Sequence, residues 1–527
     1  MKLRIAILTL GLAAGLSACD RGLLETIPND RLSESVFWKN ENDARLAVNS
    51  LYNDLDGTAI FTWDAVTDIA HTNQNFDVQA YVELGTYDAT SSKLLTEWTN
   101  AYRGIRATNY FLENVDKVAS TNTALIGQFK GEAKVLRAYQ YLKLAGFFGD
   151  VPLVTKSISI EEGRKLTRNT VTEIWDFVDK ELTEAAALLP ATYAAADKGR
   201  VTKGAALALK ARADLYAGRY QLAADAANQV IQSNTYGLYE TYEKLFSYAA
   251  ENSKEVILDK QFIKDTYSNA VFNLLAPYSQ KNAQSYYVPT RALVDMYEMA
   301  SGKLISDPAS GYDPLNPATG RDPRLRFSVY LFGDVLPSGA KFLPAPNSGT
   351  ADAIGSTYIA STTGFNIKKY INTEDYANPS NNGINLILLR YAEVLLTYAE
   401  AKTELNQVDA TVLAALNLVR NGRTDVKQPA IASGVTQGDL RTIIRRERTV
   451  ELAFEGLHLF DIRRWKTAET VMTGPVYGMT YQPASGAPVT VQVIAFNRQF
   501  DKSRHYLWPV PQKERDLNPS LTQNPGW

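Results

Sequence analysis

Residues 201–234, VTKGAALALKARADLYAGRYQLAADAANQVIQSN, are the stretch that decides the fold. Apolar and small residues recur at helical spacing on both sides of Gly218, so the segment predicts two helices joined by a tight turn. Small residues continue along the second half, at Ala223, Ala224 and Ala227. Because alanine has almost no side chain, two antiparallel helices can approach each other closely there. The stretch therefore predicts a closely packed helical pair.

A second stretch of the same kind covers residues 388–422. One apolar stripe runs along its first half, at Leu388, Tyr391, Ala392, Leu395, Tyr398 and Ala399. Both stretches match the length and small-residue pattern of a tetratricopeptide repeat unit, about 34 residues. Helical pairs of this type stack and bury a shared core. Although about 190 residues separate the two stretches, we expect them to belong to one body.

Two further helices are predicted between residues 131 and 189. The first covers residues 131–148 and stops at the glycine and proline of Gly149-Asp-Val-Pro152. The second covers residues 171–189, with Thr170 as its N-cap and Pro190 just beyond its end.

Residues 261–385 interrupt this helical pattern. They are rich in Gly, Pro, Ser, Asn and Tyr, include a short possible strand at 326–332, and carry several turn signals: Asp307-Pro308, Asn316-Pro317, Asp322-Pro323 and Pro344-Ala345-Pro346. Loops of this length are functional or disordered, and the aromatic content favours function. The predicted fold is mainly α, a tetratricopeptide-like scaffold of helical pairs with a long loop-rich ligand-binding insertion. Its single body comprises a helical part (19–260), the loop-rich part (261–385) and a C-terminal helical part with a tail (386–527).

The first 18 residues have the order of a secretory signal peptide. Lys2 and Arg4 precede a mostly apolar run at 5–16, which is too short to span a bilayer, and Cys19 follows small residues. Cys19 is the only cysteine of the chain, so it has no disulfide partner within the chain. A cysteine at this position resembles the bacterial lipobox. We expect Cys19 to be lipidated and to anchor the protein at a membrane surface, with no transmembrane helix.

Composition and charge describe an ordinary globular body. The chain is 45% hydrophobic and 21% charged, with a formal net charge of -2. It is mildly acidic and has no basic runs, which argues against nucleic-acid binding.

Four groups of motifs together resemble the SusD/RagB family of Bacteroidota outer-membrane lipoproteins. They are residues 131–139 (GEAKVLRAY) with 149–153 (GDVPL); 389–396 (LRYAEVLL) with 399–401 (AEA); 446–448 (RER), 451–452 (EL), 454–456 (FEG) and 461–465 (DIRRW); and 506–511 (YLWPVP), 518–519 (NP) and 523–527 (QNPGW). The resemblance spans nearly the whole mature chain in the family's order.

This resemblance implies a fold, a location and partners. Family members are lipid-anchored in the outer membrane and face the cell exterior. They capture oligosaccharides, sometimes peptides or other nutrients, and pass them to a SusC-type TonB-dependent transporter barrel. The shared motifs belong to the scaffold, so they identify neither the glycan and its linkage nor the ligand-binding residues.

Catalytic motifs are absent from the sequence. It has no H-E-x-x-H, G-x-S-x-G, Walker A or G-x-G-x-x-G pattern, and its three histidines, His71, His458 and His505, have no metal-pair spacing. We expect these histidines to be structural. No cofactor is predicted besides the lipid on Cys19, and calcium, although possible in the Asp- and Asn-rich loops, is not supported by any EF-hand spacing.

Three carboxylates, Glu447, Glu451 and Glu455, share one face of a predicted helix. Two carboxylates suffice for glycoside hydrolysis, so these residues are the strongest enzymatic candidates. Several cations lie nearby in sequence: Arg445, Arg446, Arg448, Arg463 and Arg464. Carboxylates paired with arginine have lowered pKa values and cannot act as general acids. We therefore predict a structural ion-pair network that fixes this helix against the segment ending at Trp465.

Two polar, aromatic-rich segments fit a sugar-binding surface. Rings cover the apolar face of a pyranose, while amides and carboxylates bind its hydroxyls. The candidate ligand-binding residues are Trp63, Asn75, Phe76, Asp77 and Tyr81 in the first segment and Tyr278, Tyr286 and Tyr287 in the second. Other polar members of these segments are Asp64, Asp68, His71, Asn73, Gln280, Asn282 and Gln284.

The leading hypothesis is a non-catalytic surface lipoprotein that binds a glycan and delivers it to a barrel. One alternative is a glycoside hydrolase that uses an unrecognised carboxylate pair. The other is a protein-binding adhesin whose aromatic residues only pack.

Overall fold

The computed structural model describes residues 37–74 and 76–527. The predicted signal peptide, Cys19 and Asn75 lie outside these residues. Within the described part of the chain, no helix is both long and apolar enough to cross a membrane.

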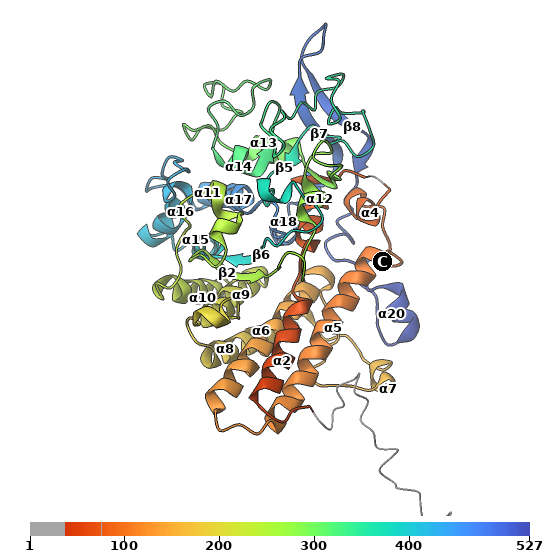
Figure 1. The fold of residues 1–527 in the computed structure, drawn as a ribbon, viewed down its shortest axis with the longest axis vertical. Coiled ribbons are helices and arrows are strands. Elements are labelled where there is room, and N and C mark those ends of the chain that lie inside the picture. Colours follow the sequence, from red (N-terminus) through yellow and green to blue (C-terminus); the bar gives the residue numbers. More distant parts are fainter. Residues whose placement is uncertain (1–36, 75) are drawn as a thin grey trace, which may run out of the picture.

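Helices dominate the first half of the chain, at the lower end of the molecule in Figure 1. In chain order the elements are α2 (Glu41–Leu51), η2 (Tyr52–Asp54), α3 (Ala59–Ala65), β1 (Ala70–Thr72), α4 (Val78–Leu84), α5 (Ser92–Asn114), η3 (Val115–Lys117), α6 (Thr123–Phe148), α7 (Ile160–Gly163), α8 (Val171–Leu188), η4 (Ala195–Asp197), α9 (Lys203–Tyr216) and α10 (Tyr220–Gln232).

The helices predicted from sequence are present in this half. Residues 131–148 form the second part of α6, which ends at Phe148 before Gly149. Helix α8 begins at Val171, and Thr170 caps it in a reciprocal arrangement with Glu173, each side chain accepting a hydrogen bond from the other residue's backbone N–H. The predicted pair at 201–234 is α9 and α10, which pack on each other.

The middle of the chain holds short elements connected by long loops. They are α11 (Tyr242–Leu245), η5 (Tyr248–Ala250), β2 (Val256–Lys260), α12 (Val271–Leu275), β3 (Tyr287–Pro289), α13 (Arg291–Met296), α14 (Arg324–Ser328), β4 (Val329–Tyr330), β5 (Asn366–Ile367) and η6 (Thr373–Asp375). The possible strand at 326–332 is mostly wrong, because α14 continues to Ser328 and only Val329 and Tyr330 pair, with β5.

Helices return in the last part of the chain. The elements are β6 (Leu386–Arg390), α15 (Tyr391–Glu404), α16 (Ala410–Asn421), α17 (Gln437–Leu452), α18 (His458–Arg464), α19 (Ala468–Val471), β7 (Gly474–Tyr481), β8 (Val489–Arg498) and α20 (Gln512–Leu517). Leu388, assigned to a helical stripe from sequence, lies instead in β6, which pairs antiparallel with β2. All five residues of β6 are buried, and periodicity cannot separate a short buried strand from a buried helix.

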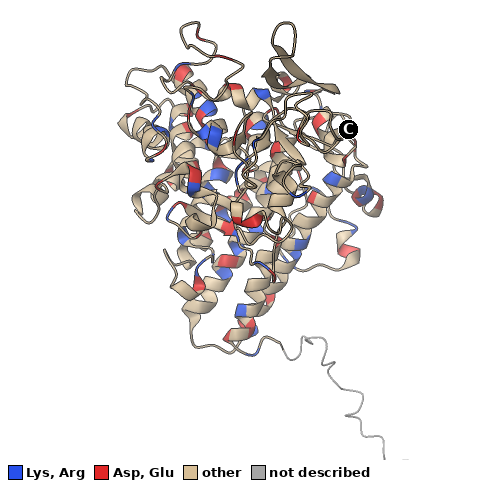
Figure 2. Ribbon diagram, turned by 45° about the horizontal axis from the view of Figure 1, so that its top comes forward, with Lys and Arg blue, Asp and Glu red and all other residues tan. Residues whose placement is uncertain are grey.

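Helical pairs from distant parts of the chain pack on one another. Helix α10 packs on α15, so the pair from residues 201–234 contacts the pair from 388–422. The C-terminal tail joins the same core, where the Trp508 ring stacks on Phe147 of α6 at 4.3 Å between centroids. The β7–β8 hairpin lies at the opposite end of the molecule from α2 (Figure 1). Acidic and basic residues are interspersed over the ribbon (Figure 2).

Candidate functional site

The two aromatic-rich segments predicted from sequence lie side by side. Strand β1 pairs antiparallel with β3, with Thr72 opposite Tyr287. The contact extends past the strand, where the Asn73 backbone N–H donates to the Tyr286 carbonyl oxygen at 3.0 Å. Residues about 215 positions apart in the chain therefore belong to one surface.

A third segment, residues 357–362, joins them through the buried side chain of Asn73. The Asn73 amide donates to the carbonyl oxygens of Ile359 and Ala360 at 3.0 and 3.2 Å. Its Oδ1 accepts from the backbone N–H and hydroxyl of Thr362, both at 2.8 Å. These four hydrogen bonds hold Tyr358 next to the residues that follow β1.

The outcome is an exposed pair of rings, Phe76 and Tyr358. Their centroids lie 6.2 Å apart with an interplanar angle of 54°. The two residues are 61% and 69% exposed, and Tyr81 of α4 is also exposed. Large rings exposed together mark a binding surface, because a soluble protein otherwise buries them. We call Phe76, Asp77, Tyr81, Tyr286 and Tyr358 the ring platform.

Polar atoms lie within the ring platform. The Tyr286 hydroxyl lies beside the Asp77 carboxylate, and burial together with this carboxylate raises the pKa of Tyr286. The Asp77 Oδ2 atom is buried and accepts no hydrogen bond from the described residues. A buried acceptor without a donor costs free energy.

The loop before β3 has an unusual backbone. Lys281, Asn282 and Ser285 all have positive φ values, of 56°, 59° and 41°. Positive φ is unfavourable for residues with a side chain, and such strain gathers at functional sites. Gln280 holds this loop in place: its amide donates to the Ser338 hydroxyl at 3.0 Å, and its Oε1 accepts from the Ser338 backbone N–H at 2.9 Å.

Two of the predicted ligand residues are core residues in this structure. Trp63 is 4% exposed, and its ring packs edge-on against Phe147 and Phe460. Its indole N–H donates to Glu97 at 3.0 Å. Tyr287 is also buried, with its hydroxyl 2.8 Å from that of Thr62. Stacking on a sugar needs an uncovered ring face, so we leave both residues out of the ring platform.

Two aromatic residues remain to be placed: Tyr278, which was predicted from sequence, and Tyr358, which was not. Tyr278 is half-buried and makes no ring contact with the other aromatic residues of the described chain. Tyr358 was missed from sequence, although it is the only aromatic residue in the small-residue run 349–364, GTADAIGSTYIASTTG. A lone ring among glycine, serine and threonine has few partners in its own segment, and that is the signal that could have found it.

The three histidines are buried and bonded, as predicted. His71 Nδ1 lies 3.0 Å from Glu83, His458 Nε2 lies 2.8 Å from Asp68, and His505 Nδ1 accepts from the Asp501 backbone N–H at 3.0 Å. No cluster of three or more His, Cys, Asp or Glu side chains suited to a metal ion occurs within 37–74 and 76–527.

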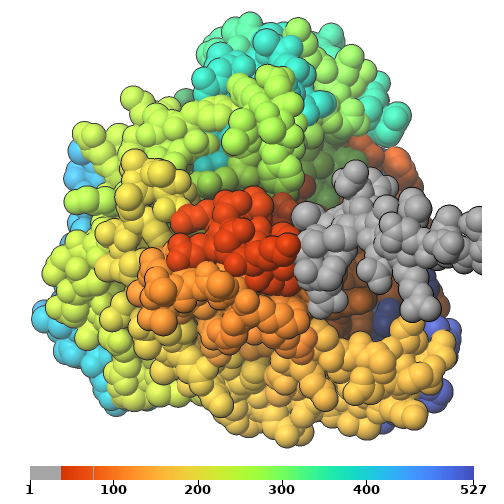
Figure 3. Space-filling view, turned by 60° about the horizontal axis from the view of Figure 1, so that its bottom comes forward, coloured from red at the N-terminus to blue at the C-terminus, as the bar shows by residue number. Residues whose placement is uncertain are grey.

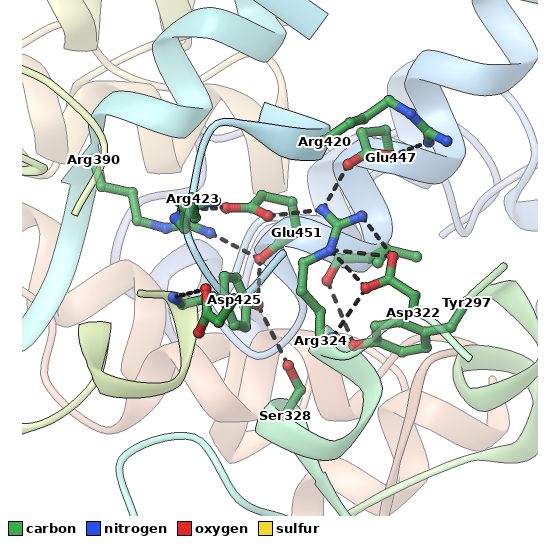
Figure 4. A network of polar contacts seen from close by, with 12 residues as sticks. Tyr297, Asp322, Arg324, Ser328, Arg390, Arg420, Arg423, Asp425, Glu447 and Glu451 are labelled. Carbon is green, nitrogen blue, oxygen red and sulfur yellow. Dashed lines mark hydrogen bonds and ion pairs between the residues drawn. The ribbon is translucent and has the colours of Figure 1, made fainter. Parts of the chain in front are cut away.

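The predicted ion-pair network is present around Glu451 of α17 (Figure 4). One Glu451 oxygen accepts from Arg390 at 2.8 Å and Arg423 at 2.9 Å, and the other accepts from Arg324 at 2.9 Å. Burial alone would raise the pKa of Glu451, but the surrounding guanidinium groups hold that pKa well below its usual range. Glu451 is therefore a permanent anion and cannot donate a proton.

The neighbouring carboxylates follow the same pattern. Glu447 accepts from Arg324 and Arg420, both at 2.6 Å. Glu455 accepts from Arg390 at 2.6 Å and from Lys369 at 2.8 Å.

The partners of these three carboxylates differ from those predicted. Nearby arginines pair elsewhere: Arg446 with Glu298, Arg448 with Asp461, and Arg464 with Glu400. Arg445 lies 3.7 Å from Glu404, and Arg463 donates to the Gly146 carbonyl oxygen. The prediction that arginines near in sequence pair with these carboxylates was wrong. Side chains on one helix face contact the elements that pack on that face, here α14, β6 and α16. The bond between Arg448 and Asp461 does join α17 to α18, as predicted.

Comparisons with known proteins agree with this architecture. The family model described as "SusD family" matches residues 254–527, and one described as "Starch-binding associating with outer membrane" matches residues 37–215. SusD-like protein P38 of Formosa agariphila is 26% identical over 97% of this chain and 96% of its own length.

Solved structures share the fold. The crystal structure of a SusD-like carbohydrate-binding protein from Bacteroides fragilis has 28% identity, covers 92% of this chain and 100% of its own, and superposes with a TM-score of 0.85. A laminarin-binding SusD-like protein, 21% identical, covers 93% of this chain and 100% of its own with a TM-score of 0.73.

Proposed function

The chain belongs to the SusD family, and we propose that it captures a glycan at the ring platform without cleaving it. We further propose that lipidated Cys19 anchors it in the outer membrane, facing the cell exterior. From there it passes the glycan to a SusC-type TonB-dependent transporter barrel.

The exposed ring pair is the observation that carries this proposal. The faces of Phe76 and Tyr358 are tilted by 54° to each other, so two sugar units of a curved or branched chain can each meet one ring. The Asp77 carboxylate and the Tyr286 hydroxyl, which lie beside each other, are the polar groups next to the rings that can bind sugar hydroxyls. Exposed rings flanked by a few polar groups suit carbohydrate better than a charged ligand.

The comparisons support a glycan as the ligand class. One family description refers to starch binding and the outer membrane, and the Bacteroides fragilis relative is named a carbohydrate-binding protein.

The state of the carboxylates supports binding without hydrolysis. A glycosidase needs one acid with a raised pKa facing a second carboxylate across the sugar. Glu447, Glu451 and Glu455 are instead neutralised by buried cations.

Isothermal titration against a panel of oligosaccharides, including maltooligosaccharides and laminarin oligosaccharides, tests the proposal. We expect the wild-type chain to bind at least one of them, and Phe76→Ala and Tyr358→Ala each to weaken binding about tenfold. Leu222→Ala on α10, also an exposed apolar side chain, is the control and leaves affinity unchanged. Unchanged affinity in both ring variants would place the site elsewhere.

Two other measurements address catalysis and anchoring. Incubation with a bound glycan should release no shorter product, and product would favour the hydrolase. Purification of the full chain from detergent-solubilised outer membranes should recover a large barrel protein and palmitate on Cys19. Cys19→Ser should lose the palmitate and release the protein from the membrane.

A further inference from the structure

A cleft lies apart from the ring platform. It has a volume of about 330 Å³ and lies between the end of α2, the turn η4 and the residues that follow β2. None of the ring platform residues lines it. Figure 3 looks onto this side of the molecule, with α2 in red bordered by yellow residues near position 200. We infer that this cleft is a second saccharide-binding subsite, an inference that rests on the proposed glycan-binding function.

Tyr267 supplies an aromatic surface in the cleft. Its ring stacks on Phe262 at 5.4 Å between centroids and 10° between planes. Paired backbone hydrogen bonds of 2.9 Å between Ile263 and Tyr267 fix this turn. Tyr267 is nevertheless 44% exposed, with the Lys260 ammonium 6.0 Å from its ring centroid. A partly exposed ring supported by a stacked neighbour is suited to packing against a pyranose.

The polar wall of the cleft is held in place by the protein itself. Arg200 donates to Asn49 Oδ1 at 2.7 Å, which leaves the Asn49 amide N–H groups available to a ligand. Lys260 donates to the backbone carbonyl oxygens of Asn53 and Leu55 at 2.9 and 2.6 Å. Because Arg200 and Lys260 already have acceptors, these two side chains present little free charge, and the exposed Lys198 is the third cation of the lining.

Asp259 is the buried acceptor of the cleft. It is 4% exposed, and its Oδ2 accepts one hydrogen bond, from the Asn385 amide at 3.0 Å. No cation of the described chain forms an ion pair with it, whereas Asp197 in the same cleft pairs with Arg45 and Arg200. Burial accordingly raises the pKa of Asp259 to about 7. A buried carboxyl without a cation is costly unless other donors reach it.

The backbone at Asp259 also departs from regular pairing. The register between β2 and β6 shifts between Leu258 and Asp259, and an irregularity of this kind redirects a side chain and is frequent next to binding sites. Asp259 lines the 330 Å³ cleft and an adjoining cavity of about 190 Å³. Asp259, next to this irregularity, therefore lies where both spaces meet.

The chemistry of the lining selects a neutral polyhydroxyl ligand. An exposed ring, amide donors and a carboxyl acceptor match the apolar face and the hydroxyls of a sugar. The lining mixes two acids, Asp197 and Asp259, with three cations, Lys198, Arg200 and Lys260, so it favours neither sign of charge, and a metal ion would find no cluster of three carboxylates among the described residues. A glycan long enough to reach both the cleft and the ring platform would gain affinity from the second contact.

The test uses a Phe76→Ala/Tyr358→Ala chain, in which the ring platform is disabled, and the oligosaccharide that the wild-type chain binds most tightly. We expect titration calorimetry to show weaker residual binding in this double variant. Adding Tyr267→Ala should reduce that residual affinity by at least about tenfold, and Tyr267→Phe, which keeps the ring, should retain it. Asp259→Asn, nearly the same shape, should also weaken it.

The possible outcomes separate the two proposals. If the wild-type chain binds a glycan and the double variant binds none, the cleft is not a subsite and the ring platform proposal stands. If residual binding survives Tyr267→Ala unchanged, the cleft is likewise excluded. If the wild-type chain binds no oligosaccharide, both proposals are wrong. Thermal unfolding of each variant checks that it is folded.

Discussion

Around Glu451 the side chains are charged, buried and held by ion pairs, whereas around Phe76 they are aromatic and exposed to solvent. The first region joins α14, β6, α16 and α17, and the second is built on loops next to β1 and β3. The charged groups that hold the helices together are already paired with one another, so they are not available to bind a ligand. Rings that contact little else contribute little to stability and remain available for binding.

The largest loss of stability is expected when the charge of Glu451 is removed, because this change disrupts the ion-paired region. Glu451→Gln keeps the size of the side chain but leaves three guanidinium groups short of an anion. We expect the free energy of unfolding to fall by about 3 to 5 kcal/mol, measured by denaturant titration. Glu161→Gln is the control, because its partner Arg164 is exposed and exposed pairs contribute little. Equal effects of the two changes would contradict the contrast.

The pH dependence of stability should expose the same network. The pKa values of Glu451 and Glu455 are lowered on folding, so their stabilisation is present above the ordinary glutamate pKa of about 4.5 and is lost as pH falls. We expect wild-type stability to decrease steadily below about pH 4.5. The Glu451→Gln chain should show a shallower decrease, and an identical slope would show that Glu451 does not contribute.

Asp259 differs from Glu451 because it is a buried acid that forms no ion pair with a cation of the described chain. Its pKa is raised to about 7, so the folded state favours the protonated form and stability is lost as pH rises from the ordinary aspartate range through 7. Asp259→Asn removes that loss. We expect the variant's stability relative to wild type to be higher at pH 8 than at pH 5, by at most about 3 kcal/mol, in denaturant titrations. A gain at pH 5 instead would reverse the assignment.

The smallest change in stability is expected at the ring platform. Phe76→Ala removes an exposed ring whose only described ring contact is Tyr358. The free energy of unfolding should change by no more than about 0.5 kcal/mol, although glycan affinity falls. A loss of several kcal/mol would mean that Phe76 is a packing residue.

Much of the helical scaffold could be predicted, because it depends on local rules. Thr170 accepts its hydrogen bond from a residue three positions away, and the stripe of α15 repeats within one helix. Leu388 was misassigned because a short apolar run has the same composition in a buried strand and a buried helix. The candidate site was predicted as two segments, and Tyr358 was missed because its place beside Phe76 depends on Asn73, more than 280 positions away.

By itself, the sequence determined the helical pairs and the presence of a carboxylate row at Glu447, Glu451 and Glu455, and it predicts a leader at 1–18 before Cys19. Only the tertiary structure decided which cations neutralise that row and which rings reach solvent. The physical reason is the distance along the chain over which each effect acts. Periodicity and capping act over a few residues, whereas burial depends on every segment that packs nearby. Trp63 and Phe76 lie 13 positions apart in similar polar sequence, yet helices from distant parts of the chain cover the first and leave the second exposed.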